Sequence, residues 1–557
     1  MIFFTLLSAV VAAATEDLQY HECFEHYRCA RLVLPLDWLD RSDNRTIIVP
    51  IIKLPAVVCD DDPSFGGSVF CNPGGPGGSG VQQVLTQGRQ LQAMLDRHLH
   101  YEIVSFDPRG IGLSSPLATC FRTAAARKAF NWHARMAGDL NQGAEAILRN
   151  YAVRRKYANL CLETDTQNDE IMRYAGTPSV ARDMVAMVDR IDELRRKGSA
   201  SERNPRDLPR LQYIGFSYGT ILGNYFATLF PGRVGRMVLD GVVDADDYAQ
   251  GPGWMTGLVD ADKIFSGFFE GCWNHNPLCP VRQETDVTHN DMEARVDAFI
   301  TSLDKSPKII RYNNVLVPVT GNALRAFICM SLYNPHANFK VLAEVLSEAM
   351  AGNATLLAKS LFMAKKVTFL GDNGGAIPAK RRLQQGNDPA FAIICGDGDD
   401  LSSKGLRWWQ EYISIQMARS HIMGPAWVNT RFGCSSWRIR PNWRITGPFV
   451  TPEADIAGLP DTSTALILFM SNRLDPVTPL IAAKRMAGQH PGSGLLVQNT
   501  MGHTVLGTRP SMCVARALRD YFEFGTLPSA PSRIASCEPR CQPWDDNFSK
   551  FPLDLFD

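Results

Sequence analysis

One serine of the chain lies in a setting that suits a nucleophile. Ser217 is the middle residue of the pentapeptide GFSYG, which runs from Gly215 to Gly219. The pentapeptide joins a predicted strand, 211–215, to a predicted helix that ends near residue 230. Because glycine has no bulk, this pattern favours a sharp, strained turn that exposes the hydroxyl above the edge of a sheet. The other interpretation is a tight turn that holds no nucleophile.

A serine hydroxyl needs a base to take its proton, and the base needs an acid to orient it. With a nucleophile on a strand–turn–helix elbow, the acid and then the base follow the serine along the chain. His503 lies in the loop after a predicted strand, 494–498, where the base is expected. The other downstream histidines lie in a less regular stretch or before that strand; they are His275, His289, His336, His421 and His490.

Two aspartates compete for the role of the acid. Asp475, in the segment SNRLDPV, directly follows a predicted strand at 464–469. Asp240 stands at the end of the preceding predicted strand, 234–239. We expect Asp475 to be the acid and Asp240 to brace loops.

Acyl transfer also needs N–H donors for the negative oxygen of the tetrahedral intermediate. The glycine-rich loop NPGGPGGSG, residues 72–80, follows a short predicted strand and lets backbone N–H groups approach a substrate closely. We expect Gly75 and Tyr218 to form this oxyanion hole, with Gly74 as the alternative register. The loop is a poor phosphate cradle, because it lacks the P-loop lysine and the chain has no GxGxxG motif.

The elements around these residues alternate between strands and helices. Residues 30–37 and 46–53 predict a hairpin, 101–106 predicts a buried strand, and 121–196 is largely helical in pattern. Alternation of this kind predicts an α/β fold with a mostly parallel central sheet and helices on both faces.

The pattern loosens between residues 245 and 455, where Trp, Pro, Asn and Cys are frequent. We interpret this stretch as a largely helical cap inserted into one α/β core. The core is then formed by residues 15–244 and 456–540, and 541–557 is a tail. Helical patterns in the cap occur at 256–271, 291–303 and 338–366.

The composition limits the class of protein. The 557 residues are 45% hydrophobic and 20% charged, which is typical of a globular chain. Lys and Arg together number 57, as do Asp and Glu, so the net charge is zero. A nucleic-acid partner is therefore not expected. The chain has no run of 18 apolar residues, so no transmembrane helix is predicted.

Several features predict an oxidising, extracellular compartment. Residues 2–13 form an apolar run that ends in small residues, which resembles a signal peptide cleaved near Ala14; the alternative is a buried strand or short core helix. The chain has fourteen cysteines, and glycosylation sequons at Asn44, Asn353 and Asn547. Without a CxxC pair or an HExxH motif, disulfides are favoured over zinc. We expect a secreted, disulfide-bonded glycoprotein.

Five motifs in order resemble the secreted tripeptidyl aminopeptidases, α/β-hydrolases related to prolyl aminopeptidases. They are NPGGPGGSG, DPRGIGLSS at 107–115, GFSYG, NRLDPVTP and the Gly-His pair at His503. The resemblance spans the chain from about Cys23 to Cys537. It implies the α/β-hydrolase fold, with Ser217 as nucleophile, Asp475 as acid and His503 as base, the last two in a C-terminal section at about 430–540.

The resemblance also implies disulfides Cys395–Cys434, Cys120–Cys161 and Cys513–Cys537. It implies an exopeptidase that releases short peptides or single residues from a free N-terminus. Such an enzyme needs a carboxylate for the substrate ammonium and a lid, for which the insertion is the natural candidate. The acidic cluster Asp397, Asp399 and Asp400 is more simply a solvated loop. No cofactor or metal is implied, since a serine triad needs neither.

Two other functions compete with the peptidase. The same triad opens the acyl bond of an ester, lactone or thioester, so an enzyme acting on a small molecule is the alternative. A catalytically dead binding protein would lack the nucleophile or the base, and all three residues are present.

Overall fold

The computed structural model describes residues 14–198, 208–275, 279–370, 385–452, 467–528, 534–539 and 543–544. Residues 1–13 of the predicted signal peptide, most of the predicted tail and the sequon at Asn547 lie outside these ranges. None of the described helices is both long and apolar enough to cross a bilayer.

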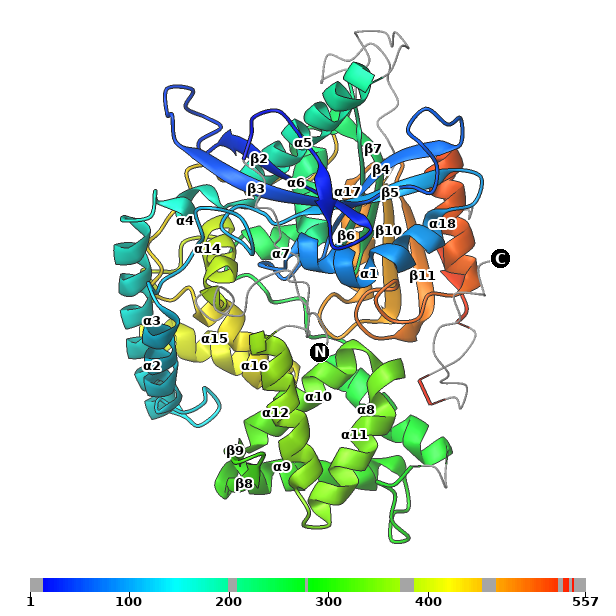
Figure 1. Cartoon of the computed structure of the whole chain (residues 1–557). Coiled ribbons are helices and arrows are strands. Elements are labelled where there is room, and N and C mark those ends of the chain that lie inside the picture. The colour runs from blue at the N-terminus through cyan, green and yellow to red at the C-terminus, as the bar shows by residue number, and fades with distance from the viewer. Residues whose placement is uncertain are drawn as a thin grey trace, which may run out of the picture.

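A ten-stranded sheet forms the centre of the molecule (Figure 1), in the order β1-β2-β3-β5-β4-β6-β7-β10-β11-β12. The predicted hairpin is present as β2 and β3, and the pairs from β5 to β12 are parallel, which confirms the predicted α/β fold class. The strands are β1 (His21–Cys23), β2 (Tyr27–Pro35), β3 (Thr46–Leu54), β4 (Phe65–Asn72), β5 (His100–Phe106), β6 (Leu211–Phe216), β7 (Val234–Asp240), β10 (Ile467–Leu474), β11 (Gly494–Met501) and β12 (Ile534–Cys537).

Helices cover both faces of this sheet. Successive strand residues point to opposite faces, so Val69 packs against α1 (Gly80–Leu95) and α18 (Met512–Phe524). Its neighbour Phe70 belongs to the larger core on the other face. That core is covered by α5 (Thr177–Gly198), α6 (Tyr218–Leu229) and α17 (Leu480–Gln489).

The segment between β7 and β10 is largely helical, and its helices α8 to α12 gather below the sheet in Figure 1 around a separate apolar core. It also holds a β-hairpin that the sequence analysis missed, with Asn313 and Asn314 both at positive φ in the turn, a signal typical of a two-residue hairpin loop. Its elements are α7 (Ala245–Ala249), α8 (Ala261–Asn274), α9 (His289–Lys305), β8 (Lys308–Tyr312), β9 (Val315–Val319), α10 (Gly321–Tyr333), α11 (Pro335–Met350), α12 (Thr355–Leu370), α14 (Asp388–Asp397), α15 (Leu406–Arg419) and α16 (Gly424–Phe432).

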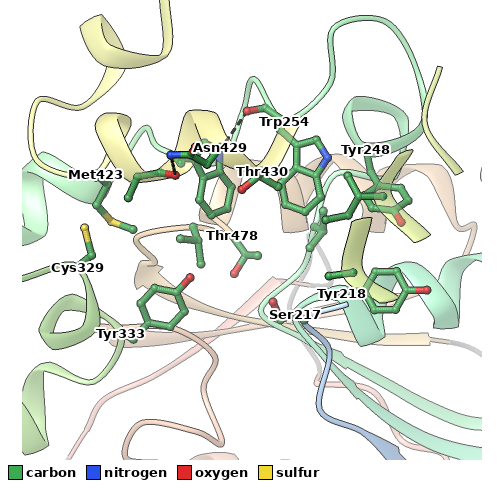
Figure 2. Close-up of a pocket in the computed structure, with 18 of the residues that line it drawn as sticks. Ser217, Tyr218, Tyr248, Trp254, Cys329, Tyr333, Met423, Asn429, Thr430 and Thr478 are labelled. Atoms are coloured by element: carbon green, nitrogen blue, oxygen red, sulfur yellow. Dashed lines mark hydrogen bonds between the residues drawn. The ribbon is translucent and has the colours of Figure 1, made fainter. Parts of the chain in front are cut away.

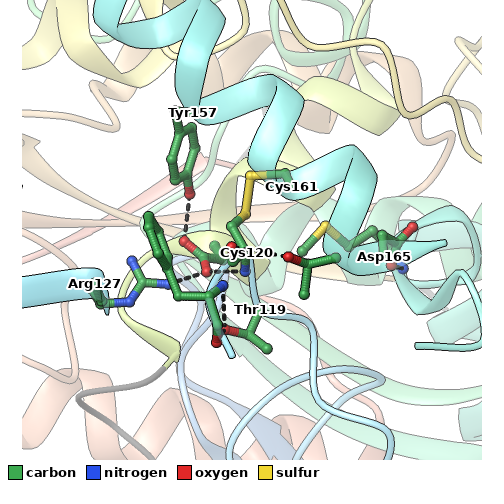
Figure 3. The surroundings of a disulfide bond; sticks show 10 residues. Thr119, Cys120, Arg127, Tyr157, Cys161 and Asp165 are labelled. Carbon is green, nitrogen blue, oxygen red and sulfur yellow. Dashed lines mark hydrogen bonds and ion pairs between the residues drawn. A yellow bond between two sulfur atoms is a disulfide. The ribbon is translucent and has the colours of Figure 1, made fainter. Parts of the chain in front are cut away.

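Disulfides join the three predicted cysteine pairs and two pairs that are close in sequence, Cys23–Cys29 and Cys272–Cys279. Figure 3 shows Cys120–Cys161, which fixes α3 (Ala144–Asp165) to the loop after β5. Beside it the buried carboxylate of Asp388, on α14, pairs with Arg127 and accepts the hydroxyl of Tyr157. These bonds connect the insertion to the helices that precede β6.

The buried histidine at the end of α17 should make the fold sensitive to acid. In His490, Nε2 lies 2.7 Å from Asn224 Oδ1 and Nδ1 lies 2.7 Å from Thr451 Oγ1. Burial lowers the pKa of His490 from 6.5 to about 4. Between these two pH values the unfolded chain binds more protons than the folded chain, so the folded state loses up to about 3 kcal/mol as the pH falls.

The variant His490→Gln should therefore lose less thermal stability than the native protein between pH 7 and pH 4.5. The melting temperature across this range measures the effect, and the exposed His133→Gln is the matched control. Equal pH slopes for the native protein and His490→Gln would show that this histidine does not carry the acid sensitivity.

Candidate active site

The predicted site residues come together at one edge of the sheet. The adjacent parallel strands β6, β7, β10 and β11 all end there. Ser217 follows β6, Asp240 ends β7, Asp475 follows β10 and His503 follows β11. In open α/β sheets this carboxyl edge is where ligands bind.

Ser217 occupies the sharp turn that the pentapeptide predicts. Its φ of +54° and ψ of −122° are strained for a residue with a side chain. The turn fits only because its neighbours are glycines: a Cβ on Gly215 would lie 2.4 Å from the carbonyl oxygen of Gly219. A Cβ on Gly74 would lie 2.3 Å from the carbonyl oxygen of Phe216.

His503 is oriented by Asp475. Its Nδ1 lies 3.0 Å from each carboxylate oxygen of that fully buried aspartate. The backbone N–H groups of Val477, Thr478 and Thr504 also donate to the carboxylate, at 2.8 to 3.0 Å. This arrangement places a proton on Nδ1 and leaves Nε2 as the acceptor. Ser217 and His503 line one recess of about 200 Å³.

Asp240, the competing acid, braces the loop that carries the histidine, as the sequence analysis expected. Its two carboxylate oxygens accept the N–H groups of Val505 and Leu506, at 2.7 and 2.8 Å. Burial raises its pKa to about 7. Asp475 is therefore the aspartate that contacts the imidazole of His503.

Two backbone N–H groups near Ser217 are free to meet a substrate oxygen. Tyr218 is the first residue of α6, so its N–H has no acceptor within the helix. Gly75 lines the same cavity as Ser217, and its N–H has no partner among the described residues. The N–H of Gly74 already donates to Asn72 Oδ1 at 2.9 Å. The geometry therefore favours Gly75 over the alternative register.

The motif DPRGIGLSS supports this site without entering it. The carboxylate of Asp107 accepts the hydroxyl of Ser79 at 2.5 Å and the N–H of Val81 at 3.1 Å, which fixes the end of the glycine-rich loop. Arg109 is buried and forms a two-point ion pair with Asp183, at 2.6 and 2.7 Å. Sequence reasoning had assigned these residues no role.

An apolar cavity of about 640 Å³ opens above Ser217 and Tyr218 (Figure 2), within the range of small-molecule sites. Helices α10 and α16 of the insertion form much of its wall. Its aromatic lining residues are Tyr218, Tyr248, Trp254, Phe327, Tyr333, Phe391 and Trp427.

Two protein families match parts of this chain. The "alpha/beta hydrolase fold" family matches residues 67–277, and the "TAP-like protein" family matches residues 420–536. The protein is a serine hydrolase of the α/β-hydrolase fold. The section that matches the TAP-like family contains Asp475 and His503.

Three curated relatives are similar to this hydrolase over most of its length. The serine protease Hip1 of Mycobacterium tuberculosis is 25% identical over 91% of this chain and 86% of its own. A tripeptidyl aminopeptidase of Streptomyces lividans is 26% identical over 96% and 89%. Carboxylesterase B of M. tuberculosis is 26% identical over 91% and 86%. The first two support a peptidase-type α/β-hydrolase.

Two residues that contact His503 of the hydrolase were missed by sequence reasoning, Tyr333 and Thr478. The N–H of His503 donates to the carbonyl oxygen of Tyr333 at 2.8 Å, and the two rings meet edge-on at 5.0 Å. Thr478 Oγ1 lies 3.1 Å from His503 Nδ1. No motif marks Tyr333, whereas Thr478 lies three residues after the predicted acid.

The variant Thr478→Val should lower kcat about fivefold, because it removes the hydroxyl that lies 3.1 Å from His503 Nδ1, a contact worth roughly 1 kcal/mol that helps Asp475 hold the ring. The substitution keeps the shape of the side chain. Thr228→Val is the matched control, since the buried hydroxyl of Thr228 has no hydrogen-bond partner in the part of the chain that the structure describes. Steady-state kinetics on one substrate measure both variants. A change in KM alone would assign Thr478 to substrate binding instead.

The expectation of a solvated acidic loop is wrong for Asp397. This side chain is buried, and its carboxylate accepts the N–H of Thr177 at 3.0 Å and the hydroxyl of Tyr248 at 2.8 Å. The hydroxyls of Thr177 and Tyr218 lie 2.5 Å apart, so Asp397 holds Tyr248 directly and Tyr218 through Thr177, and both tyrosines line the cavity of the hydrolase. Burial raises its pKa. Asp399 instead pairs with Arg444 at 2.6 Å.

Proposed function

We propose that the hydrolase is a serine exopeptidase that releases short peptides or single residues from free N-termini. The observation that carries the proposal is the apolar cavity of about 640 Å³ that Ser217 lines. It has room for a few residues of an extended chain and excludes a folded one. The names of the Hip1 and tripeptidyl aminopeptidase relatives support peptides as the substrate class.

In the proposed mechanism, Ser217 Oγ attacks the carbonyl carbon of the scissile bond while His503 Nε2 takes its proton. The carbonyl oxygen becomes an oxyanion that accepts hydrogen bonds from the N–H groups of Gly75 and Tyr218. As the C–N bond breaks, His503 returns the proton to the leaving amine. Water, activated by the same histidine, then hydrolyses the acyl-enzyme. Asp475 stabilises the imidazolium that forms in both steps.

A small-molecule esterase is the second candidate, because carboxylesterase B is similar over the same length. The triad chemistry is common to both functions, and the fold does not fix the substrate. The two candidates therefore differ only in what the cavity binds.

The test compares four chromogenic substrates with the purified protein. They are a free-amine tripeptidyl anilide, its N-acetylated twin, a prolyl anilide and a short-chain ester. We expect cleavage of the free-amine anilides, and the ratio of tripeptide to proline release gives the type of exopeptidase. Ester cleavage without anilide cleavage would refute the peptidase and favour the esterase.

We further propose that the enzyme acts outside the cell. Its disulfides are typical of an oxidising compartment. The sequon residues Asn44 and Asn353 are both exposed, as glycosylation requires. Recovery of the protein from culture medium, with a mass that falls on deglycosylation, is the expected result. A cell-associated, unmodified protein would contradict it.

A further inference from the structure

Two carboxylates line the apolar cavity, and they differ in how their charge is balanced. Asp244 is buried and forms an ion pair with Arg485 at 2.9 Å. Its other oxygen accepts the N–H groups of residues 246 and 247 and so caps α7. The charge of Asp244 is therefore already compensated within the protein.

Asp247 has no such counter-ion. Among the described residues, its carboxylate accepts only neutral donors: the N–H of Met255 at 3.0 Å, and the N–H and hydroxyl of Thr256, both at 2.8 Å. These three bonds fix the position of the carboxylate. A carboxylate has about four lone-pair sites, so one remains for a further donor. A half-buried anion in an apolar cavity favours a cationic ligand.

The cavity wall next to Asp247 is formed by aromatic residues, and one of them has a strained backbone. Trp254 has a φ of +63°, which a bulky residue rarely adopts, and its N–H donates to the carbonyl oxygen of Asp247 at 3.1 Å. The carbonyl oxygen of Trp254 accepts the indole N–H of Trp427 at 3.3 Å, and the two rings meet edge-on at 5.5 Å. Figure 2 shows Trp254 above the cavity, opposite Ser217. Backbone strain of this kind is typical of ligand-binding positions.

We infer that Asp247 binds the N-terminal ammonium of the substrate, while Trp254 and Trp427 pack against the apolar side chains of its first residues. This inference rests on the proposed peptidase function, and it names the substrate class as peptides with a free N-terminus and apolar leading residues. The ammonium forms a charge-assisted hydrogen bond with the carboxylate. Asp247 acts on specificity and takes no part in bond cleavage.

A purely structural role for Asp247 is the competing explanation, because its bonds to residues 255 and 256 also brace the turn. The two roles differ in their dependence on substrate charge. A brace affects every substrate equally, whereas an ammonium anchor affects only substrates that carry the amine.

The experiment measures kcat/KM of the native protein and of Asp247→Asn on two tripeptidyl anilides with the same apolar side chains. One has the free amine, and in the other hydrogen replaces the amine. We expect Asp247→Asn to lower kcat/KM about a hundredfold on the free-amine substrate and less than threefold on the desamino substrate. The conservative Asp247→Glu should restore part of the preference for the amine. A similar loss on both substrates, or on neither, overturns the inference.

The control variant is Asp246→Asn, which removes the same charge from the neighbouring residue on α7. Asp246 pairs with Arg485 and Gln489 and does not line this cavity, so it should not change the preference for the amine. Alanyl and propionyl p-nitrophenyl esters form a second substrate pair. If only esters are cleaved, the peptidase proposal fails, and the alanyl-to-propionyl ratio in Asp247→Asn still decides the role of Asp247.

Discussion

Replacing Ser217 with alanine should lower kcat by about a millionfold, because the other triad members have no nucleophile to activate. The variant should keep its fold, since the side chain makes no hydrogen bond among the described residues and the strained turn is held by its glycine neighbours. Hydrolysis of the free-amine tripeptidyl anilide and of the short-chain ester measures the loss.

A fluorophosphonate reagent gives a second readout for this variant. It should add one mass label to the native protein, on the peptide that contains Ser217, and none to Ser217→Ala. Ser302→Ala, on the exposed side of α9, is the matched control and should keep both activity and labelling. Full activity of Ser217→Ala would refute the serine mechanism.

Replacing Asp475 with asparagine should lower kcat about ten-thousandfold, because an amide no longer holds His503 in the tautomer with a proton on Nδ1. Asp475 is fully buried and contacts Nδ1 with both oxygens at 3.0 Å. The melting temperature should fall only modestly, since the amide oxygen still accepts some of the backbone N–H groups around it.

Asp240→Asn is the matched control for the choice of acid. Asp240 accepts backbone N–H groups of the same loop and makes no hydrogen bond to the imidazole. We expect this variant to lose stability, because only one of the two N–H groups keeps an acceptor. Its kcat should fall less than about tenfold. An equal kcat loss in both variants, with both proteins folded, would leave the acid unassigned.

The sequence alone predicted the elements of the α/β core well, because periodicity and turn chemistry are local signals. The pentapeptide around Ser217 and the strands before Asp475 and His503 were recognisable for this reason. The hairpin at Asn313 and Asn314 was missed although its turn carries a local signal. The short edge strand β12 was also missed; it pairs in parallel with β11, and the pairing of parallel strands depends on chain segments that are not adjacent in sequence.

The sequence by itself thus determined the fold class, the order of the strands that carry the triad and which residues are chemically able to form it. Only the tertiary structure decided what surrounds them. It buried Asp397 beneath two tyrosines, brought Tyr333 against His503, and gave Asp247 no counter-ion among the described residues. These features depend on contacts between the core and the insertion, whose partners are far apart along the chain. Local patterns specify the helices of the insertion but not where they pack, so the binding wall of the enzyme had no signature in the sequence.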